Sequence, residues 1–233
     1  MNLLIVSDIH GMYKQFEEIL RHWDQESILV ILGDMIDRGE YSYEVVQRIM
    51  SLQAEFPDKV VVLKGNHEDM LMYYIDGKME DPTPFLVNGG IEMLRSFIKD
   101  IDEEAVEQNA EILKTQFAAE IDFLRGARHY FQYGNLLITH AGFDSALHDW
   151  QQTASHDFLW IREHYRNENK TGLLNIFGHT PTRNMHETDD IWISPCQTYI
   201  GIDGACAYGG QLNALLISEE GEILNTYLVP SEK

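Results

Sequence analysis

Five short apolar runs constrain the fold of this chain more than any other feature of its sequence. They lie at residues 3–6, 28–32, 60–63, 136–139 and 173–177. Each is continuous and rich in Val, Ile or Leu, which is typical of strands buried on both faces. Segments with helical spacing follow the first two runs, at residues 12–23 and 43–56. This alternation of strand and helix predicts an α/β fold.

The pattern changes between about residues 77 and 126, where two helices are expected, at 85–98 and 103–124. Asp102 precedes the second of these and is a plausible N-cap for it. Apolar residues then recur from Val106 to Leu124 at alternating four- and three-residue steps, which makes one apolar stripe. We interpret this region as a helical insert within a single domain that spans residues 1–233.

The final third of the chain returns to strands, which are predicted at 191–193, 198–202, 211–217 and 222–229. Residues 219–222 would form the turn of a hairpin between the last two. Strand-rich segments on both sides of the helices predict a two-sheet β-sandwich with helices on its outer faces.

The composition is that of an ordinary globular protein, with 44% hydrophobic and 24% charged residues. No apolar run approaches the roughly 18 residues of a membrane helix, and the N-terminus lacks a signal-peptide pattern. We therefore expect a cytoplasmic protein with no membrane partner. The net charge of −21 disfavours nucleic acid as a partner, because so acidic a surface repels phosphate backbones. Bound divalent cations would reverse that field locally.

Polar residues of metal-binding types follow each of the five apolar runs at once. Ligands in open α/β folds bind just beyond the carboxyl ends of strands, and these residues fall there. Carboxylate, imidazole and amide groups make a mixed nitrogen and oxygen donor set without thiolate, and one carboxylate can bridge two ions. Any one of these pieces is weak, whereas five in order predict a metal site. The carboxylate, imidazole and amide residues are Asp8, His10, Asp34, Asp37, Asn66, His67, His140 and His179, and Arg38 directly follows Asp37.

At these positions the sequence resembles the PPP-type branch of the calcineurin-like metallophosphoesterases, in its bacterial and phage form. Residues 33–39 match that branch's G-D-x-x-D-R-G, and residues 65–68 match its G-N-H-E. Residues 140–142 and 178–180 match its H-[AG]-G and G-H-T pieces. The resemblance spans roughly residues 3 to 216. It implies the fold already expected here, a two-sheet β-sandwich flanked by helices (αββα) with a helical insert.

The resemblance also implies a role for each matched residue. Asp8 and His10 would hold one metal ion, Asp34 would bridge two, and Asn66, His140 and His179 would hold the second. His67 would be the general acid, oriented by Asp37, and Arg38 would grip the phosphate. The implied reaction is direct in-line attack by a metal-bridging hydroxide. Manganese is the favoured metal, with iron, zinc or magnesium as alternatives.

Three further segments resemble the family less closely. Arg162, in a segment like L-W-x-R, is a candidate second phosphate-binding arginine, and the alternative is an ordinary surface arginine. Tyr208 either lines the site or packs at a strand end; near it, Gly204 and Ala205 replace the usual Thr-Gly. The N-G-G segment at residues 88–90 forms either a loop over the site or a helix start on the core.

Three functions compete on these motifs. The favoured one is a serine/threonine phosphoprotein phosphatase, whose partner is a phosphorylated protein. The nearest alternative is a symmetrical diadenosine tetraphosphate hydrolase, or a phosphatase of another small phosphoester, because those enzymes share the motifs. A catalytically silent binding module would lack one or more ligands, and none is missing here.

Overall fold

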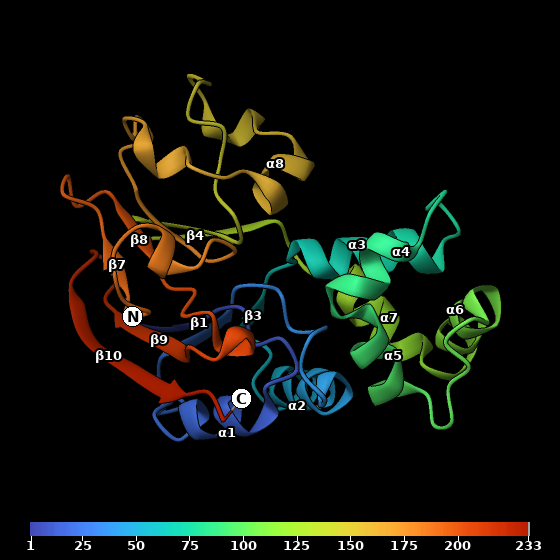
Figure 1. The fold of residues 1–233 in the computed structure, drawn as a ribbon. Helices are drawn as coiled ribbons and strands as arrows, with labels where there is room; N and C mark the ends of the chain where they lie inside the picture. Colours follow the sequence, from blue (N-terminus) through green and yellow to red (C-terminus); the bar gives the residue numbers. More distant parts are fainter. Residues whose placement is uncertain (233) are drawn as a thin grey trace.

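Two five-stranded β-sheets form the centre of the computed structural model, which describes residues 1–232 (Figure 1). The first sheet has the order β10-β9-β1-β2-β3 and the second has the order β4-β5-β6-β8-β7. The strands are β1 Leu3–Val6, β2 Ile28–Ile31, β3 Val60–Val62, β4 Tyr130–Tyr133, β5 Leu136–Thr139, β6 Leu174–Phe177, β7 Trp192–Ile193, β8 Tyr199–Gly201, β9 Gln211–Ile217 and β10 Ile223–Pro230.

The two sheets face each other across a core of aliphatic side chains. In β1, Leu3 and Ile5 belong to this core between the sheets, whereas Leu4 and Val6 pack on the opposite, helix-covered face. All four are completely buried. Both faces of the strand are therefore apolar, which explains why these segments read as continuous runs instead of alternating patterns.

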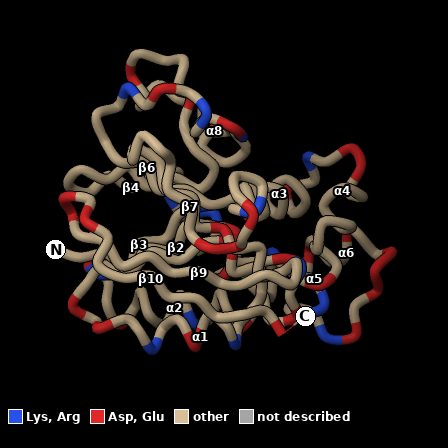
Figure 2. The backbone as a smooth tube through the Cα atoms, turned by 60° about the vertical axis from the view of Figure 1, so that its left-hand side comes forward, with Lys and Arg blue, Asp and Glu red and all other residues tan. Residues whose placement is uncertain are grey.

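Helices cover the outer face of each sheet, and Figure 2 shows this order of layers from α8 down to α1 and α2. Helices α1 Tyr13–Leu20 and α2 Ser42–Glu55 pack on the first sheet. Helix α8 Ser155–Trp160 packs on the second through Phe158, which lies in an aromatic cluster with Phe177 and Tyr199. The predicted two-sheet architecture flanked by helices is confirmed.

The predicted insert is helical and packs beside α2, against the same core cluster as α1 and α2. Edge-to-face contacts among Tyr43, Phe97 and Phe117, with ring centroids 5.2–5.7 Å apart, join it to α2. Preceding it is helix α3, which the sequence analysis did not predict. The helices here are α3 Asn66–Ile75, α4 Thr83–Phe85, α5 Ile91–Phe97, α6 Val106–Gln116 and α7 Ala118–Arg125.

Two details of the predicted insert helices were wrong. The predicted helix at 103–124 is two helices, because the backbone leaves the helical region at Phe117 (φ −122°, ψ 32°). The apolar stripe survives the break, since Ala110, Leu113 and Leu124 are all buried. Asp102 does not cap the helix, which begins at Val106; its carboxylate instead accepts from Glu104 N in the preceding turn (3.1 Å).

Among residues 1–232, no helix combines the length and the apolar character needed to cross a membrane. The two cysteines are not joined: Cys196 is exposed and Cys206 is buried.

Candidate active site

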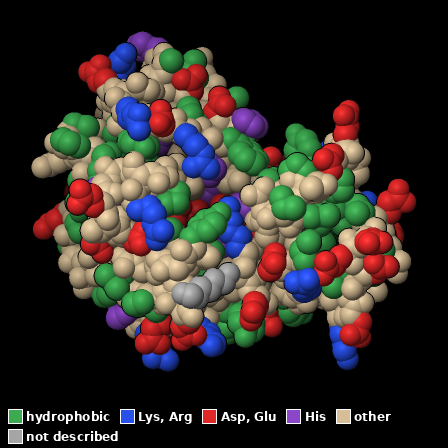
Figure 3. All heavy atoms as spheres, viewed as in Figure 1, with side chains coloured by type: hydrophobic (Ala, Val, Ile, Leu, Met, Phe, Trp, Pro, Cys, Tyr) green, Lys and Arg blue, Asp and Glu red, His purple; other side chains and the backbone are tan. Residues whose placement is uncertain are grey.

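The loops that follow β1, β2, β3, β5 and β6 meet at one edge of the sandwich. Figure 3 shows acidic, basic and histidine side chains gathered in a hollow between α8 and the α3–α4 region. The six predicted metal ligands all lie in these loops or at the start of α3, and none is more than 6% exposed. The structure therefore brings together residues that lie up to 171 positions apart in the chain. The ligands are Asp8, His10, Asp34, Asn66, His140 and His179.

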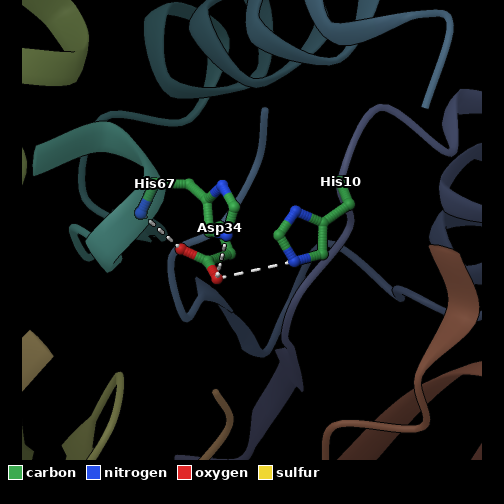
Figure 4. Close-up of side chains that lie close together, drawn as sticks. All are labelled: His10, Asp34 and His67. Atoms are coloured by element: carbon green, nitrogen blue, oxygen red, sulfur yellow. Dashed lines mark hydrogen bonds and ion pairs between the residues drawn. The ribbon is translucent and has the colours of Figure 1, made fainter. Parts of the chain in front are cut away.

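Asp34 lies between two groups of histidines. Its Oδ2 atom is 3.5 Å from Nε2 of His10 and 3.9 Å from Nε2 of His67, which point toward it in Figure 4. Its Oδ1 atom is 3.4 Å from Nε2 of His140, and His179 completes that second group. In each group the possible ligand atoms lie within 4.8 Å of one another. A carboxylate with one oxygen toward each group is suited to bridge two ions.

The hydrogen bonds of the histidines fit metal binding. Nδ1 of His10 lies 2.8 Å from the carbonyl oxygen of Ile36, and Nδ1 of His140 lies 2.8 Å from that of Leu32. A carbonyl can only accept, so Nδ1 carries the hydrogen and Nε2 presents its lone pair to the site. Burial lowers the pKa of His10 well below its usual value, so this imidazole is neutral, as a ligand must be.

Asn66 faces the second group. Its Oδ1 atom lies 2.8 Å from Nδ1 of His179 and 3.1 Å from Nε2 of His140. Burial also lowers the pKa of His179 well below its usual value. An amide oxygen between two imidazole nitrogens, close to the Asp34 carboxylate, is a donor set that suits a divalent ion.

Asp8 comes from the end of β1 and accepts hydrogen bonds from the backbone N of His179, at 3.0 and 3.2 Å, and from the Ser7 hydroxyl. Gly178 permits this contact, since a Cβ atom there would lie 2.2 Å from Asp8 Oδ2. Burial, and then repulsion from Asp34, raises the pKa of Asp8 to about 7. Two crowded carboxylates favour the binding of a cation, which would restore the charge of Asp8.

The electrostatics of Asp34 differ from those of Asp8. Burial alone would raise its pKa, but three surrounding histidines and Arg38 outweigh burial and hold the pKa below its usual range. Asp34 therefore remains a carboxylate among imidazoles.

His67 and Asp37 form a buried pair beside this cluster. Nδ1 of His67 lies 2.5 Å from Asp37 Oδ2, and both side chains are almost completely buried. Burial lowers the pKa of His67, but attraction to Asp34 and Asp37 outweighs it and raises the pKa above the usual value. An imidazole with a raised pKa that is held by a carboxylate is suited to general acid catalysis.

Arg38 lies between two histidines of the site and the exposed ring of Tyr208. Its Nη2 atom lies 2.7 Å from Nε2 of His67, and Nη1 contacts Nε2 of His10. Its guanidinium carbon lies 4.8 Å from the centre of the Tyr208 ring, which is 58% exposed. The exposed Tyr208 ring thus lies against the Arg38 guanidinium.

Arg162 lies on the other side of the site, after α8. Its Nη1 atom is 3.3 Å from Thr180 Oγ1 and 3.5 Å from the carbonyl oxygen of His179. The side chain is otherwise exposed. Arg38 and Arg162 therefore approach the cluster from different loops.

The N-G-G segment at residues 88–90 lies within a helical stretch, at the kink between α4 and α5, where Gly89 has φ +108°. At this kink the carbonyl oxygen of Gly89 accepts a hydrogen bond from the backbone N of Arg38 (3.2 Å). The segment therefore packs on the loop that carries Arg38.

Glu68, the last residue of the G-N-H-E match, has a structural role that its motif did not predict. The Glu68 side chain is fully buried and accepts hydrogen bonds from the backbone N of Asp34, Met35 and Gly65 at 2.7–2.9 Å. It thereby holds the loop that presents Asp34 against the start of α3. The sequence could have indicated this role, because Glu68 is the third residue after Gly65, which is the spacing of a capping box at a helix start.

Asp203, after β8, was also overlooked. It is 5% exposed, and burial, followed by the charge of Asp8, raises its pKa well above the usual value. Its Oδ1 atom accepts from the backbone N of Ala205 (2.8 Å), at the start of the loop that carries Tyr208. The signal was an aspartate directly after a predicted strand, as at Asp8 and Asp34.

The backbone of the site is unusual. Among residues 1–232, eleven residues other than glycine have positive φ, and six of them are predicted site residues. This left-handed region is unfavourable for side chains with a Cβ, and such conformations concentrate at functional sites. The six are Asp8, His10, Asp34, Asp37, Arg38 and His179.

Comparison with known families agrees with this geometry. The family model of the calcineurin-like phosphoesterases matches residues 1–215. The chain belongs to the calcineurin-like phosphoesterases, in their PPP-type branch. Its reaction class is accordingly the hydrolysis of phosphoesters, and the family uses a dinuclear metal centre.

Relatives of this phosphoesterase have different substrates. Serine/threonine-protein phosphatase 1 of Salmonella typhimurium is 29% identical over 218 residues, covering 89% of this chain and 88% of that protein. The asymmetrical bis(5'-nucleosyl)-tetraphosphatase PrpE of Anoxybacillus flavithermus is 26% identical, covering 97% of this chain and 93% of that protein. A serine/threonine phosphatase structure from Saccharomyces cerevisiae superposes with a TM-score of 0.63 at 13% identity, covering 100% of this chain and 80% of the other.

Proposed function

We propose that this phosphoesterase is a serine/threonine phosphoprotein phosphatase that binds two divalent metal ions. The observation that carries the proposal is the pair His67–Asp37 with Arg38 beside it, set against the two groups of histidines around Asp34. A proton donor and a phosphate grip at the same place as a metal cradle are the groups that hydrolysis of an alkyl phosphate requires.

In this proposal Asp8 and His10 would hold one ion, Asn66, His140 and His179 would hold the second, and Asp34 would serve both. Bound ions would supply an activated water and offset the charge of the phosphate. The donor set suits manganese, which we propose as the metal, and would also accept iron, zinc or magnesium.

The remaining residues orient the substrate and move its proton. The guanidinium of Arg38 lies beside Nε2 of His10 and of His67. A guanidinium at this position can bind two phosphate oxygens in a bidentate way. His67 donates its Nε2 proton to the leaving alkoxide, and Asp37 keeps that imidazole protonated and in place. Arg162 offers a second positive charge from the opposite side.

A substrate comparison tests this proposal. Manganese-loaded protein is assayed on a phosphoserine peptide and on diadenosine tetraphosphate, with Asp34→Asn as a control that must lose activity on either. We expect release of phosphate from the peptide. The relative from Anoxybacillus flavithermus supports the dinucleotide as a second candidate substrate. Turnover of the dinucleotide alone would show that the phosphoprotein assignment is wrong.

A further inference from the structure

A groove of about 350 Å³ opens beside Arg38, on the exposed side of the site. Besides Arg38, its walls come from the kinked segment of the insert and from the loop after β8. The lining residues are Arg38, Val87, Asn88, Gly89, Glu92, Ala207 and Tyr208. The groove thus joins Arg38 to a surface segment, and specificity commonly resides in such segments.

The groove lies where the remainder of a substrate must extend. The guanidinium of Arg38 contacts His10 and His67 at the inner end, so a phosphate held there leaves its attached chain on the open side. The wall is fixed relative to this point, because Gly89 accepts the hydrogen bond from Arg38 N. A Cβ atom at Gly89 would lie 2.3 Å from that nitrogen, so the two segments are in direct contact.

The lining has an apolar part and one unpaired negative charge. Val87 is 71% exposed and Tyr208 is 58% exposed, although both are large and apolar or aromatic. Glu92, in the first turn of α5, is the only acidic residue in the lining, and its carboxylate has no hydrogen-bond or ion-pair partner within residues 1–232. This combination is complementary to a long side chain with an apolar stem and a cationic end.

The insert around the groove is negatively charged, like Glu92. Residues 77–126 contain eleven acidic and five basic side chains, and Figure 3 shows Asp and Glu predominating on that part of the surface. Such a field attracts a basic peptide and repels a polyphosphate chain.

We propose that this groove binds a lysine or arginine side chain close to the phosphorylated residue of a protein substrate, and that Glu92 selects its positive charge. The inference rests on the proposed phosphoprotein phosphatase activity and assigns its substrate class: phosphoserine or phosphothreonine segments with a basic neighbour.

The test uses the full chain loaded with manganese and a set of phosphoserine peptides of neutral sequence. A single lysine is moved through each position from three residues before the phosphoserine to three after it, and a matched set carries glutamate instead. The quantity measured is the ratio of kcat/KM for lysine over glutamate at each position. A ratio within one enzyme preparation cancels differences in metal content and folded fraction.

We expect one position at which the wild-type ratio reaches about three- to tenfold, the size of a partly exposed charge interaction. Glu92→Gln should bring that ratio close to one, and Glu92→Lys should invert it. Glu80→Gln, which removes an exposed acid from the insert outside the groove, should keep the wild-type ratio. The wild-type ratio should also shrink as salt is added.

Two results would overturn the inference in different ways. A wild-type enzyme that hydrolyses the peptides without a preference for lysine, or a preference that Glu92→Gln leaves intact, refutes the groove assignment and leaves the phosphatase assignment standing. An enzyme that hydrolyses none of the peptides but cleaves diadenosine tetraphosphate refutes the proposed function and the inference together.

Discussion

The buried cluster at the sheet edge and the exposed groove beside it are built by different means. The cluster side chains come from loops at strand ends, are at most 6% exposed, and are held by backbone hydrogen bonds to Asp8, Glu68 and the histidine Nδ1 atoms. The groove comes from an insert and a loop, and its principal side chains Val87 and Tyr208 are more than half exposed. Rigid strands thus support the part that needs fixed geometry, whereas the variable part lies on the surface.

We therefore expect the buried cluster to carry out the hydrolysis and the exposed groove to select the substrate. Changes to the predicted metal ligands should affect every phosphoester alike, and changes in the groove should affect some substrates more than others.

The largest effect is expected from Asp34→Asn, because one carboxylate serves both groups of histidines. Both ions should be lost together, and turnover of an aryl phosphate should fall by about 10³-fold or more, which corresponds to several kcal/mol of lost stabilisation. Metal analysis and an aryl phosphate assay measure this. Asp58→Asn, at an exposed loop position, is the matched control. Two ions still tightly bound in Asp34→Asn would exclude a bridging role.

His67→Asn should slow the hydrolysis of alkyl phosphates by about 10²–10⁴-fold while both ions stay bound. The loss should be smaller for aryl phosphates, because a good leaving group needs no proton. A nitrogen of His67 also lies close enough to the ligand atoms of His10 and Asp34 to bind the same ion. The metal content of the variant therefore decides whether His67 is a proton donor or a metal ligand. Loss of an ion would identify a ligand, and an equal loss of rate for both phosphates would exclude a proton donor.

Gly89→Ala connects the two regions. Its φ of +108° and the contact with Arg38 N require the backbone to move, which displaces Arg38. We expect kcat/KM to fall by about ten- to a hundredfold, as a misplaced substrate contact does. Gly77→Ala, also at positive φ but with no atom within 4 Å of the new Cβ, should lose about 1 kcal/mol of stability without that loss of activity. Equal activity of Gly89→Ala and Gly77→Ala would show that the contact between Gly89 and Arg38 does not position Arg38 for the substrate.

A buried histidine that packs against Phe177 and Tyr199 of the second sheet should affect stability and leave the chemistry unchanged. His164 is 2% exposed, and its Nε2 atom lies 2.9 Å from Asn175 Oδ1. Burial lowers its pKa to about 4, so the unfolded chain takes up a proton at a pH where the folded chain does not. This contribution to stability is complete above about pH 6.5, is lost as the pH falls toward 4, and amounts to about 3 kcal/mol.

Denaturant unfolding of the chelator-treated protein between pH 7 and 4 measures that slope. His164→Gln should flatten it, and His148→Gln, at an exposed histidine, should not. If the free energy of unfolding of His164→Gln depends on pH as in the wild type, other groups cause the loss of stability at low pH.

The sequence alone determined the strands and the residues that follow them. Nine strands were placed to within a residue or so. For the inner strands, such as β1 and β2, the reason is that burial on both faces leaves a continuous apolar run. The edge strand β4 Tyr130–Tyr133 was missed, since half-exposed aromatic residues give no such run. Helix α3 was missed because its first residues were read only as a motif.

Only the tertiary structure decided which side chains face one another. Asp34 lies between His10 and His140 because the carboxyl ends of strands in two different sheets converge, and no spacing along the chain encodes that meeting. The contact of Gly89 with Arg38, and the groove that it borders, likewise join segments 51 residues apart. Local propensity acts over a few residues, whereas a site and its selectivity depend on packing between segments that are distant in the chain.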